Sequence, residues 1–376
     1  MADVVDSCTK PAVHHWESTW PTVGPVTTTL AQLTTVGVGG PARRYVETGS
    51  SDDLIDAVRT ADADGEPLLV LGGGSNVLVG DDGFDGLVVR DARCDLGVTD
   101  ASACAGTTLV VAAGTPWSAV VDHAVANGLS GVEALAGIPG SAGATPVQNV
   151  GAYGQEVAQT IAAVRTWDRA RNAVRTLMLA DLEFGYRTSL LKSSLAQPEW
   201  GPTPRYVVLD VTFQLRKETL SRVVAYPELA KALGLQVGER APLADVRDAV
   251  LALRASKGMV LDPTDPDTCS TGSFFTNPVL DPSQAATLGP DAPRFDTPDG
   301  RVKTSAAWLI SHAGFARGHG LPGPAALSTK HVLALTNRGE ATAADILALA
   351  REVRAGVAER FGITLEPEPV LVACAL

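Results

Sequence analysis

The sequence predicts a protein of the α+β class, and three observations support this prediction. Alternating apolar segments precede and follow mixed helical segments between about residues 33 and 218. The apolar segment Leu68 to Leu71 runs into three glycines and then into a second apolar segment, whereas a dinucleotide-binding βαβ unit requires a helix there. The segment from Leu135 to Gly154 holds five glycines, two prolines and no charged residue, which neither a helix nor a central strand tolerates.

Composition narrows the classes of partner. The chain has 376 residues, of which 45% are hydrophobic and 5% aromatic, so its cores must rely on alanine, valine and leucine. The formal net charge of −12 argues against nucleic acid or an anionic membrane as a partner. No apolar run approaches the roughly 18 residues of a membrane span, and the first twenty residues lack the apolar segment of a signal peptide. The five cysteines are scattered and form no C-x-x-C pair, so we expect reduced thiols, no metal site and a cytoplasmic protein.

The first part of the chain predicts an extension, a strand and a helix. Residues 1–28 are typical of a poorly ordered extension. Gly39-Gly40-Pro41 predicts a turn, and an alternating strand then passes through Tyr45 and Val46. A helix begins at Ser51, with acidic residues in its first turn, and ends at Gly65.

The sequence Gly72-Gly73-Gly74-Ser75-Asn76 lies between two predicted strands, Leu68 to Leu71 and Val77 to Val79. Consecutive glycine N–H groups can form an anion-binding nest without a helix. The alternative is a tight β-turn that binds nothing. Both alternatives stay open at this point.

A further set of elements completes this module. In order, these are a strand over 107–113, a helix begun by Thr115-Pro116 and ended by Gly128, a hairpin of Ala163–Trp167 with Val174–Met178, a short helix that ends at Gly185 and leaves Tyr186, Arg187 and Thr188 in a loop, and a strand from Tyr206 to Leu215.

The sequence changes character over residues 219–376. In order, we expect a connection through Tyr226-Pro227-Glu228, an amphipathic helix from Leu243 to Ser256, a helix from Lys303 through Trp308, a helix capped by Thr342 and Asp345 and ended by Gly362, and an apolar strand preceded by Glu366 and Glu368. These two glutamates stand at alternate positions and therefore share one face.

The loop Leu135 to Gly154 is a candidate binding site. It has no Lys or Arg, but it offers many backbone N–H groups and neutral side chains such as Ser141 and Gln148. Such a loop suits a nucleotide pyrophosphate that is held by backbone dipoles. The alternative is a glycine-rich connection that only packs tightly.

Five segments, taken together, resemble one family. They are the Gly72–Asn76 turn, the loop Leu135–Gly154, and the sequences FGYRTS, GSFFTNP and LEPE. In this order they are similar to UDP-N-acetylenolpyruvoylglucosamine reductases, the flavoenzymes of peptidoglycan precursor synthesis, and the similarity extends from about Leu33 to the C-terminus. The resemblance implies a two-lobed FAD-binding module of the vanillyl-alcohol-oxidase (PCMH) type over residues 33–218, with lobes of about 33–97 and 98–218. It also implies an α+β substrate-binding domain over 219–376, whose last strand packs back on the first lobe.

The resemblance further implies an oxidoreductase, a UDP-N-acetylmuramate dehydrogenase. In that family NADPH gives a hydride to FAD, which passes it to the enolpyruvyl double bond of the substrate. Matched to the family motifs, Ser273 is the proton donor, Arg187 is the arginine of FGYR, and Glu368 is the second glutamate of LEPE. Hydride delivery builds negative charge beside the substrate carboxylate. A guanidinium can hold this carboxylate, and an acid must protonate the carbon next to it. From the residues alone, Ser273 would be more typical of a turn, Arg187 of a surface cation, and Glu368 of a solvated strand edge.

The resemblance assigns FAD to the glycine-rich segments and the substrate to four side chains. The predicted cofactor-binding residues are Gly72, Gly73, Gly74, Ser75, Asn76, Ile138, Pro139, Gly140, Ser141, Gly143, Ala144, Gln148, Asn149, Gly151, Ala152 and Tyr153. The predicted substrate-binding residues are Tyr186, Tyr226, Lys257 and Asn277, with Tyr226 covering the uridine diphosphate as in the longer family subtype. Two positions depart from the family pattern: Thr276 stands where a lysine often occurs, and His331 stands where a glutamine is expected.

Two other functions are alternatives. One is another flavoenzyme of the same fold, against which GSFFTNP and LEPE argue because they lie in the predicted substrate domain. The other is a nucleotide-sugar-binding protein without redox activity, which bleaching of a bound flavin by NADPH would exclude. We expect a small-molecule UDP-sugar as partner, no nucleic-acid or membrane partner, and a monomer.

Overall fold

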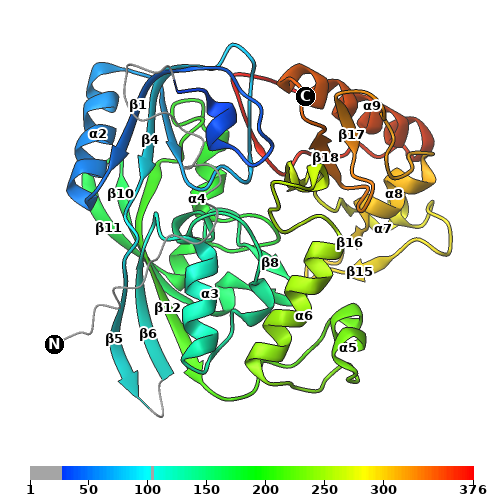
Figure 1. The fold of residues 1–376 in the computed structure, drawn as a ribbon, viewed down its shortest axis with the longest axis horizontal. Coiled ribbons are helices and arrows are strands. Elements are labelled where there is room, and N and C mark those ends of the chain that lie inside the picture. The colour runs from blue at the N-terminus through cyan, green and yellow to red at the C-terminus, as the bar shows by residue number, and fades with distance from the viewer. Residues whose placement is uncertain (1–27, 103–105) are drawn as a thin grey trace. The chain divides into compact units, whose positions relative to one another are not determined.

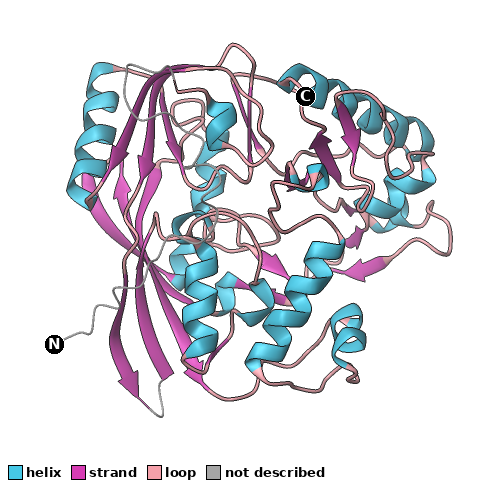
Figure 2. Ribbon diagram, viewed as in Figure 1, coloured by secondary structure: helices cyan, strands magenta, loops and turns pink. Residues whose placement is uncertain are grey.

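The computed structural model describes residues 28–102 and 106–376, and they form two compact units. The first contains Ala42–Gly74 and Asp85–Val260, and the second contains Thr29–Pro41, Ser75–Phe84 and Leu261–Leu376. Helices and strands occur in both units (Figure 2). The predicted boundary near residue 218 does not coincide with the boundary of the units, because Val224, Val246 and Val250 belong to the core of the first. Which residues form the substrate-binding domain stays a prediction.

A six-stranded antiparallel sheet forms the centre of the first unit (Figure 1). Its order is β11-β10-β12-β6-β5, and β7 pairs with the end of β12. The strands are β5 (Leu96–Ser102), β6 (Gly106–Ala112), β7 (Leu129–Ser130), β10 (Ile161–Asp168), β11 (Ala173–Met178) and β12 (Tyr206–Lys217). Helix α3 (Trp117–Ala126) packs on this sheet, where the rings of Trp117 and Phe213 lie 5.7 Å apart. The predicted hairpin of β10 and β11 is confirmed.

A smaller sheet of the first unit has the order β1-β4-β2 and carries helix α2. The elements are β1 (Ala42–Thr48), α2 (Ser51–Asp64), β2 (Leu68–Leu71) and β4 (Phe84–Asp91). The Ser50 side chain accepts a hydrogen bond from the Asp53 N–H, and Gly65 ends α2 in the left-handed conformation, which a residue without Cβ adopts at little cost. The apolar residues of α2 and β2 share a core with Trp167 and Leu209 of the large sheet.

Helices α5 (Pro227–Leu233) and α6 (Leu243–Ser256) complete the first unit together with short elements. These are η2 (Glu133–Leu135), η3 (Ala142–Ala144), β8 (Gly151–Ala152), β9 (Gln155–Glu156), η4 (Val157–Gln159), η5 (Leu179–Leu182), α4 (Leu190–Ser193) and η6 (Ser194–Ala196).

Three predictions for the first unit are wrong in detail. The expected connection at Tyr226-Pro227-Glu228 is the start of α5, because Pro227 occupies the first helical position, where its missing N–H costs nothing. The short helix before Tyr186 is the 3₁₀ turn η5, and it stops at Glu183, whose φ of 47° is left-handed, before Gly185 is reached. Pro116 is the N-cap of α3, whereas the Thr115 hydroxyl donates to the Asp95 carbonyl at 3.0 Å.

The second unit contains three small sheets, three α-helices and two 3₁₀ helices among its described residues. The sheet orders are β13-β18-β17, β14-β16-β15 and β19-β3. The elements are η1 (Leu30–Leu33), β3 (Val77–Val79), η7 (Pro266–Thr268), β13 (Ser270–Ser273), β14 (Val279–Leu280), α7 (Pro282–Ala285), β15 (Arg294–Asp296), β16 (Val302–Thr304), α8 (Ala306–His312), β17 (Ala325–Leu327), β18 (Ala334–Asn337), α9 (Ala343–Phe361) and β19 (Val370–Val372).

The apolar face of α9 forms much of the core of the second unit. Thr342 and Asp345 make the predicted capping box of this helix, and Gly362 ends it. Strand β19 pairs in parallel with β3, and Val370 stands opposite Val77. Lys303 lies in strand β16, so the helix that was expected to begin there begins at Ala306 instead.

Two further observations concern membrane-spanning helices and the cysteines. None of the helices within residues 28–102 and 106–376 is both long and apolar enough to cross a bilayer. Cys94 is disulfide-bonded, whereas Cys269 and Cys374 are free thiols, so the expectation of reduced thiols fails at Cys94.

Candidate functional site

The two predicted glycine-rich segments lie against each other in the first unit. A Cβ atom added to Gly73 would lie 2.6 Å from the Gly140 Cα, and one added to Gly72 would lie 2.8 Å from the Ser141 Oγ. The Gly73 distance is shorter than a Cβ atom permits, so the two backbones approach as closely as they do only because Gly73 is glycine. At Gly72 the nearest atom is the end of the Ser141 side chain, which can rotate away. We refer to residues 72–74 and 140–141 as the glycine cradle.

The glycine cradle presents backbone donors. The N–H groups of Gly73, Gly74, Gly140 and Ser141 have no hydrogen-bond acceptor among residues 28–102 and 106–376. Two groups next to these donors are used within the protein: the Gly140 carbonyl accepts from the Trp117 N–H at 3.0 Å, and the Ala142 N–H donates to the Thr115 carbonyl at 2.8 Å. N–H groups left over at two touching loops form a site for an anion such as a pyrophosphate.

Gly143 and Ala144, also predicted to bind the cofactor, use their N–H groups within the protein. The Gly143 N–H donates to the Ala113 carbonyl at 2.9 Å, and the Ala144 N–H donates to the Ser141 carbonyl at 3.0 Å. A Cβ at Gly143 would lie 2.4 Å from the Ala113 Cβ. Gly143 therefore has a packing reason to be glycine, independent of any ligand.

The second half of the loop surrounds Arg187. The Arg187 Nη2 donates to the Gly151 carbonyl at 2.9 Å, and its Nη1 lies 3.5 Å from the Asn149 carbonyl. The guanidinium also lies over the Tyr186 ring, 5.4 Å from its centroid. Gln148 is half-buried in this part of the loop, and Ile138, Pro139 and Ala152 are half-buried too.

Tyr153 and the start of α5 form a second cluster with the end of α6. The Tyr153 and Tyr226 rings meet edge to face at 5.4 Å. The Lys257 Nζ lies 5.7 Å from the Tyr153 ring centroid and 2.5 Å from the Glu228 Oε2. Burial raises the pKa of the Tyr153 hydroxyl, against the opposing charges of Lys257 and Arg254. The predicted substrate residues Tyr226 and Lys257 thus lie together beside the predicted cofactor residue Tyr153.

Arg254 belongs to this cluster and was not predicted. Its Nη2 donates to the Met259 carbonyl at 2.9 Å, and its Nε is buried without a partner among the described residues. Burial lowers the pKa of the Arg254 guanidinium to about 10, against the opposing effect of Tyr153. The spacing of Arg254 and Lys257, three positions apart, could have indicated that both lie on one side of the helix end.

Glu133 is a second residue that sequence reasoning missed. It is fully buried immediately before the loop, and its carboxylate accepts from the Gln155 Nε2 at 2.9 Å, the Gly131 N–H at 2.6 Å and the Arg222 N–H at 2.8 Å. Gln155 stands immediately after the loop and in turn accepts from the Ala134 N–H at 2.9 Å. The hydrogen bond between Glu133 and Gln155 therefore joins the two ends of the loop. No local pattern in the sequence indicates that Glu133 is buried, because its donors Gln155 and Arg222 come from other segments.

In the second unit, Ser273 and Glu368 lie on neighbouring backbone segments. The Glu368 N–H donates to the Phe274 carbonyl at 2.8 Å, and the Thr276 N–H donates to the Glu366 carbonyl at 3.0 Å. Phe274 and Phe275 are fully buried between Ser273 and Thr276. We refer to residues 273–276 and 366–368, joined by these bonds, as the phenylalanine bridge.

Other predicted residues of the second unit support this arrangement. The Asn76 Nδ2 donates to the Glu368 carbonyl at 3.3 Å, and the Val370 N–H donates to the Asn76 carbonyl at 3.0 Å. The Asn277 Oδ1 accepts from the Ala306 N–H at 2.9 Å, at the start of α8. The His331 Nδ1 accepts from the Leu333 N–H at 3.1 Å. Ser75 is half-buried next to Asn76.

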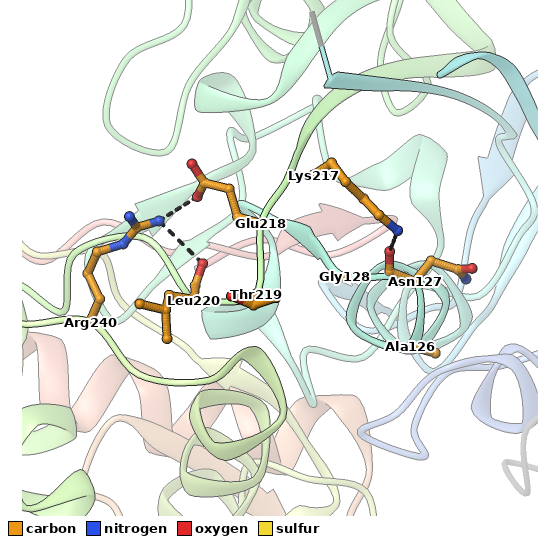
Figure 3. Close-up of a pocket in the computed structure, with 8 residues that line it drawn as sticks. All are labelled: Ala126, Asn127, Gly128, Lys217, Glu218, Thr219, Leu220 and Arg240. Atoms are coloured by element: carbon orange, nitrogen blue, oxygen red, sulfur yellow. Dashed lines mark hydrogen bonds and ion pairs between the residues drawn. The ribbon is translucent and has the colours of Figure 1, made fainter. Parts of the chain in front are cut away.

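A hollow of about 720 Å³ lies elsewhere in the first unit (Figure 3). Its lining residues are Ala126, Asn127, Gly128, Lys217, Glu218, Thr219, Leu220 and Arg240. The Lys217 Nζ donates to the Asn127 carbonyl, and Arg240 pairs with Glu218, so both cations are already used within the protein. None of the predicted site residues lines this hollow, and we assign no function to it.

Comparison with known proteins decides the family. The UDP-N-acetylenolpyruvoylglucosamine reductases of Thermobifida fusca and Cutibacterium acnes are each 54% identical to this chain, over 92% of its length and over 97% and 90% of theirs. The chain belongs to the UDP-N-acetylenolpyruvoylglucosamine reductase family. The model of the C-terminal domain of this reductase matches residues 263–372, and the model of an FAD binding domain matches residues 42–177.

A solved structure supports the same reductase fold. The crystal structure of the UDP-N-acetylenolpyruvylglucosamine reductase from Thermus caldophilus matches with a TM-score of 0.60 and 27% identity, over 92% of this chain and 97% of that one. The predicted family, the α+β class with an FAD-binding module, and the assignment as an FAD-dependent oxidoreductase of peptidoglycan precursor synthesis are thereby confirmed.

The residues of the first unit fit FAD. Both segments of the glycine cradle, residues 72–74 and 140–141, lie within the part of the chain that matches the FAD binding domain. The N–H groups of the glycine cradle, which find no acceptor in the described residues, suit the pyrophosphate of FAD, and the absence of side chains at Gly72 and Gly73 leaves the backbone accessible to it.

Proposed function

We propose that this protein reduces UDP-N-acetylenolpyruvoylglucosamine to UDP-N-acetylmuramate with NADPH as electron donor. Two curated relatives that are 54% identical carry the name of this reductase. The observation that carries the proposal is the contact of Gly73 with Gly140, because it brings together, in the matched FAD binding domain, four N–H groups that have no acceptor within the described part of the chain.

Bound FAD supplies the hydride transfer that links oxidation of NADPH to reduction of the enolpyruvyl double bond. We infer that Gly73, Gly74, Gly140 and Ser141 hold its pyrophosphate through their N–H groups. The other predicted cofactor residues, apart from Asn149, would line the rest of the cofactor.

Arg187 holds the substrate carboxylate in this proposal. Its guanidinium is directed by the Gly151 carbonyl at 2.9 Å, and a guanidinium can bind a carboxylate through two parallel hydrogen bonds. The positive charge also stabilises the enolate that forms when the hydride adds to the adjacent carbon of the double bond.

Ser273 donates the proton that completes the reduction. One carbon of the double bond gains the hydride, the other gains the Ser273 hydroxyl proton, and water re-protonates the serine afterwards. Serine is a weak acid, so this transfer occurs only once the enolate has formed. Glu368 orients the substrate beside Ser273, and Lys257 and Asn277 help to stabilise the developing charge.

Tyr226 and Tyr186 bind the substrate outside the reacting centre. Tyr226 is 44% exposed and rests edge to face on Tyr153, so its ring can cover a uridine diphosphate. We further infer a cytoplasmic monomer without a nucleic-acid or membrane partner, consistent with the net charge of −12.

Separate measurement of the two half-reactions tests this function. In stopped-flow experiments, NADPH should bleach the flavin, and the enolpyruvyl substrate should restore its absorbance. In Ser273→Ala, bleaching should proceed at the wild-type rate, and reoxidation should slow by about 10²- to 10⁴-fold, the range of general acid catalysis. Ser311→Ala, an exposed serine of α8, is the matched control and should change neither step. Equal slowing of both steps in Ser273→Ala would remove Ser273 as proton donor.

A further inference from the structure

We propose that Asn149 is a positioning residue that directs Arg187, and that its side chain does not bind FAD. This inference rests on the proposed function, in which Arg187 holds the substrate carboxylate. It differs from the sequence prediction, which assigned Asn149 to the cofactor.

The Asn149 side chain spends its hydrogen-bonding groups inside the protein. Its Nδ2 donates to the Glu156 Oε2 at 2.8 Å and to the Gly185 carbonyl at 3.1 Å, and its Oδ1 accepts from the Ala158 N–H at 3.2 Å. An amide nitrogen has two N–H donors, and both are used. The residue is 2% exposed, so little of it is accessible to a ligand.

The Gly185 carbonyl that Asn149 holds belongs to the turn that carries Arg187. Gly185 N–H donates to the Thr188 carbonyl at 3.1 Å, and Thr188 N–H donates back to the Gly185 carbonyl at 3.3 Å. Arg187 has a left-handed φ of 55° within this turn. Because a left-handed arginine costs free energy, the turn needs support from its surroundings, and the Asn149 amide supplies part of it.

The backbone of Asn149 reaches the same guanidinium. Asn149 itself has a left-handed φ of 47°, which asparagine tolerates better than most residues. This conformation leaves its carbonyl 3.5 Å from the Arg187 Nη1, next to the Gly151 carbonyl that accepts from Nη2 at 2.9 Å. Both carbonyls lie at N–H groups of the guanidinium and therefore help to fix the direction in which it points.

Asn149→Gly tests the role of the side chain without straining the backbone, since glycine adopts a left-handed φ freely. Asn172→Gly is the matched control, because Asn172 has a left-handed φ of 50° but lies exposed in the turn between β10 and β11. Flavin content, bleaching by NADPH and reoxidation by the enolpyruvyl substrate are measured for both variants.

We expect Asn149→Gly to retain FAD and to be bleached at the wild-type rate. Reoxidation should slow on the order of 10- to 100-fold, because small misplacement of a positioned group has effects of that size. The control should match wild type in all three measurements. A double-mutant cycle with Arg187→Lys should show that the slowing by Asn149→Gly largely disappears once the guanidinium is gone.

Two results would overturn the proposal. One is loss of FAD from a folded Asn149→Gly protein, which would return the side chain to the cofactor site. The other is an independent effect on reoxidation, in which Asn149→Gly slows the Arg187→Lys protein by the same factor as it slows the wild type. If Asn149→Gly does not fold, Glu156→Gln is measured in its place, because Glu156 accepts a hydrogen bond from the Asn149 amide. Glu156→Gln should slow reoxidation by less than Asn149→Gly would. Unaltered reoxidation in Glu156→Gln would overturn the proposal. Wild-type protein that is bleached but not reoxidised by the substrate would instead contradict the proposed function.

Discussion

The glycine cradle and the phenylalanine bridge achieve fixed backbone geometry by opposite means. In the cradle, Gly73 lies so close to Gly140 that even a Cβ would not fit. In the bridge, the backbone beside Ser273 is held by two fully buried rings, Phe274 and Phe275, whose centroids lie 5.1 Å apart. One region depends on missing side chains and the other on large ones.

The two regions should therefore be sensitive to opposite kinds of substitution. The cradle should fail when atoms are added, because its N–H groups must stay exposed to an anion. The bridge should fail when atoms are removed, because its rings anchor the segment in the core of the second unit. Three substitutions test this contrast between the two regions.

Phe274→Ala should have the largest effect. Truncation of a fully buried phenylalanine leaves a cavity and should lower the free energy of unfolding by about 3–5 kcal/mol. Phe295→Ala, whose ring is 55% exposed on β15, is the control and should change stability by less than about 0.5 kcal/mol. Denaturant unfolding measures both, and similar values for the two variants would show that the bridge is not anchored by its ring.

Gly73→Ala should have an intermediate effect, seen in FAD binding. The new Cβ would lie 2.6 Å from the Gly140 Cα, and such overpacking costs about 1–3 kcal/mol. If this cost falls on the bound state, FAD affinity drops by about 10- to 100-fold. Gly49→Ala is the control, because no atom lies within 4 Å of its Cβ position. Titration of the apoprotein with FAD compares the two, and equal affinities would show that the cradle adjusts freely.

Gly272→Ala should have the smallest effect and shows a different use of glycine. Gly272 precedes Ser273 with a left-handed φ of 75°, but no atom lies within 4 Å of its Cβ position. Only conformational strain of about 1 kcal/mol is therefore expected, and Gly272→Asn should recover part of it. Thermal unfolding of the two variants measures this; a larger loss in Gly272→Asn than in Gly272→Ala would contradict a purely conformational role.

Local signals explain what the sequence predicted well. The predicted strands Leu68–Leu71 and Val77–Val79 and the helix Leu243–Ser256 agree with the bounds of β2, β3 and α6. Continuous apolar runs and an amphipathic pattern are properties of the segment itself. The connection predicted at Pro227 was wrong because proline interrupts a helix but also suits its first turn, and Pro227 begins α5.

The site was less predictable because its contacts join distant parts of the chain. The glycine content of residues 72–74 and 140 favoured a ligand, but nothing in either segment indicates that Gly73 and Gly140 touch. Asn149 lies in a motif that suggested a cofactor, yet its partners Glu156 and Gly185 are known only from the fold. The role of each site residue stays a prediction for the experiments above.

The parallel pairing of Val77 with Val370 sets an order for biosynthesis. Strand β3 leaves the ribosome long before β19, the strand with which it pairs. The second unit therefore cannot complete its fold before Val372 has emerged, whereas the large sheet of the first unit has all of its strands once Lys217 has emerged. A chain without Val370–Val372 would leave β3 with an unpaired, apolar edge, the kind of surface through which nascent proteins aggregate.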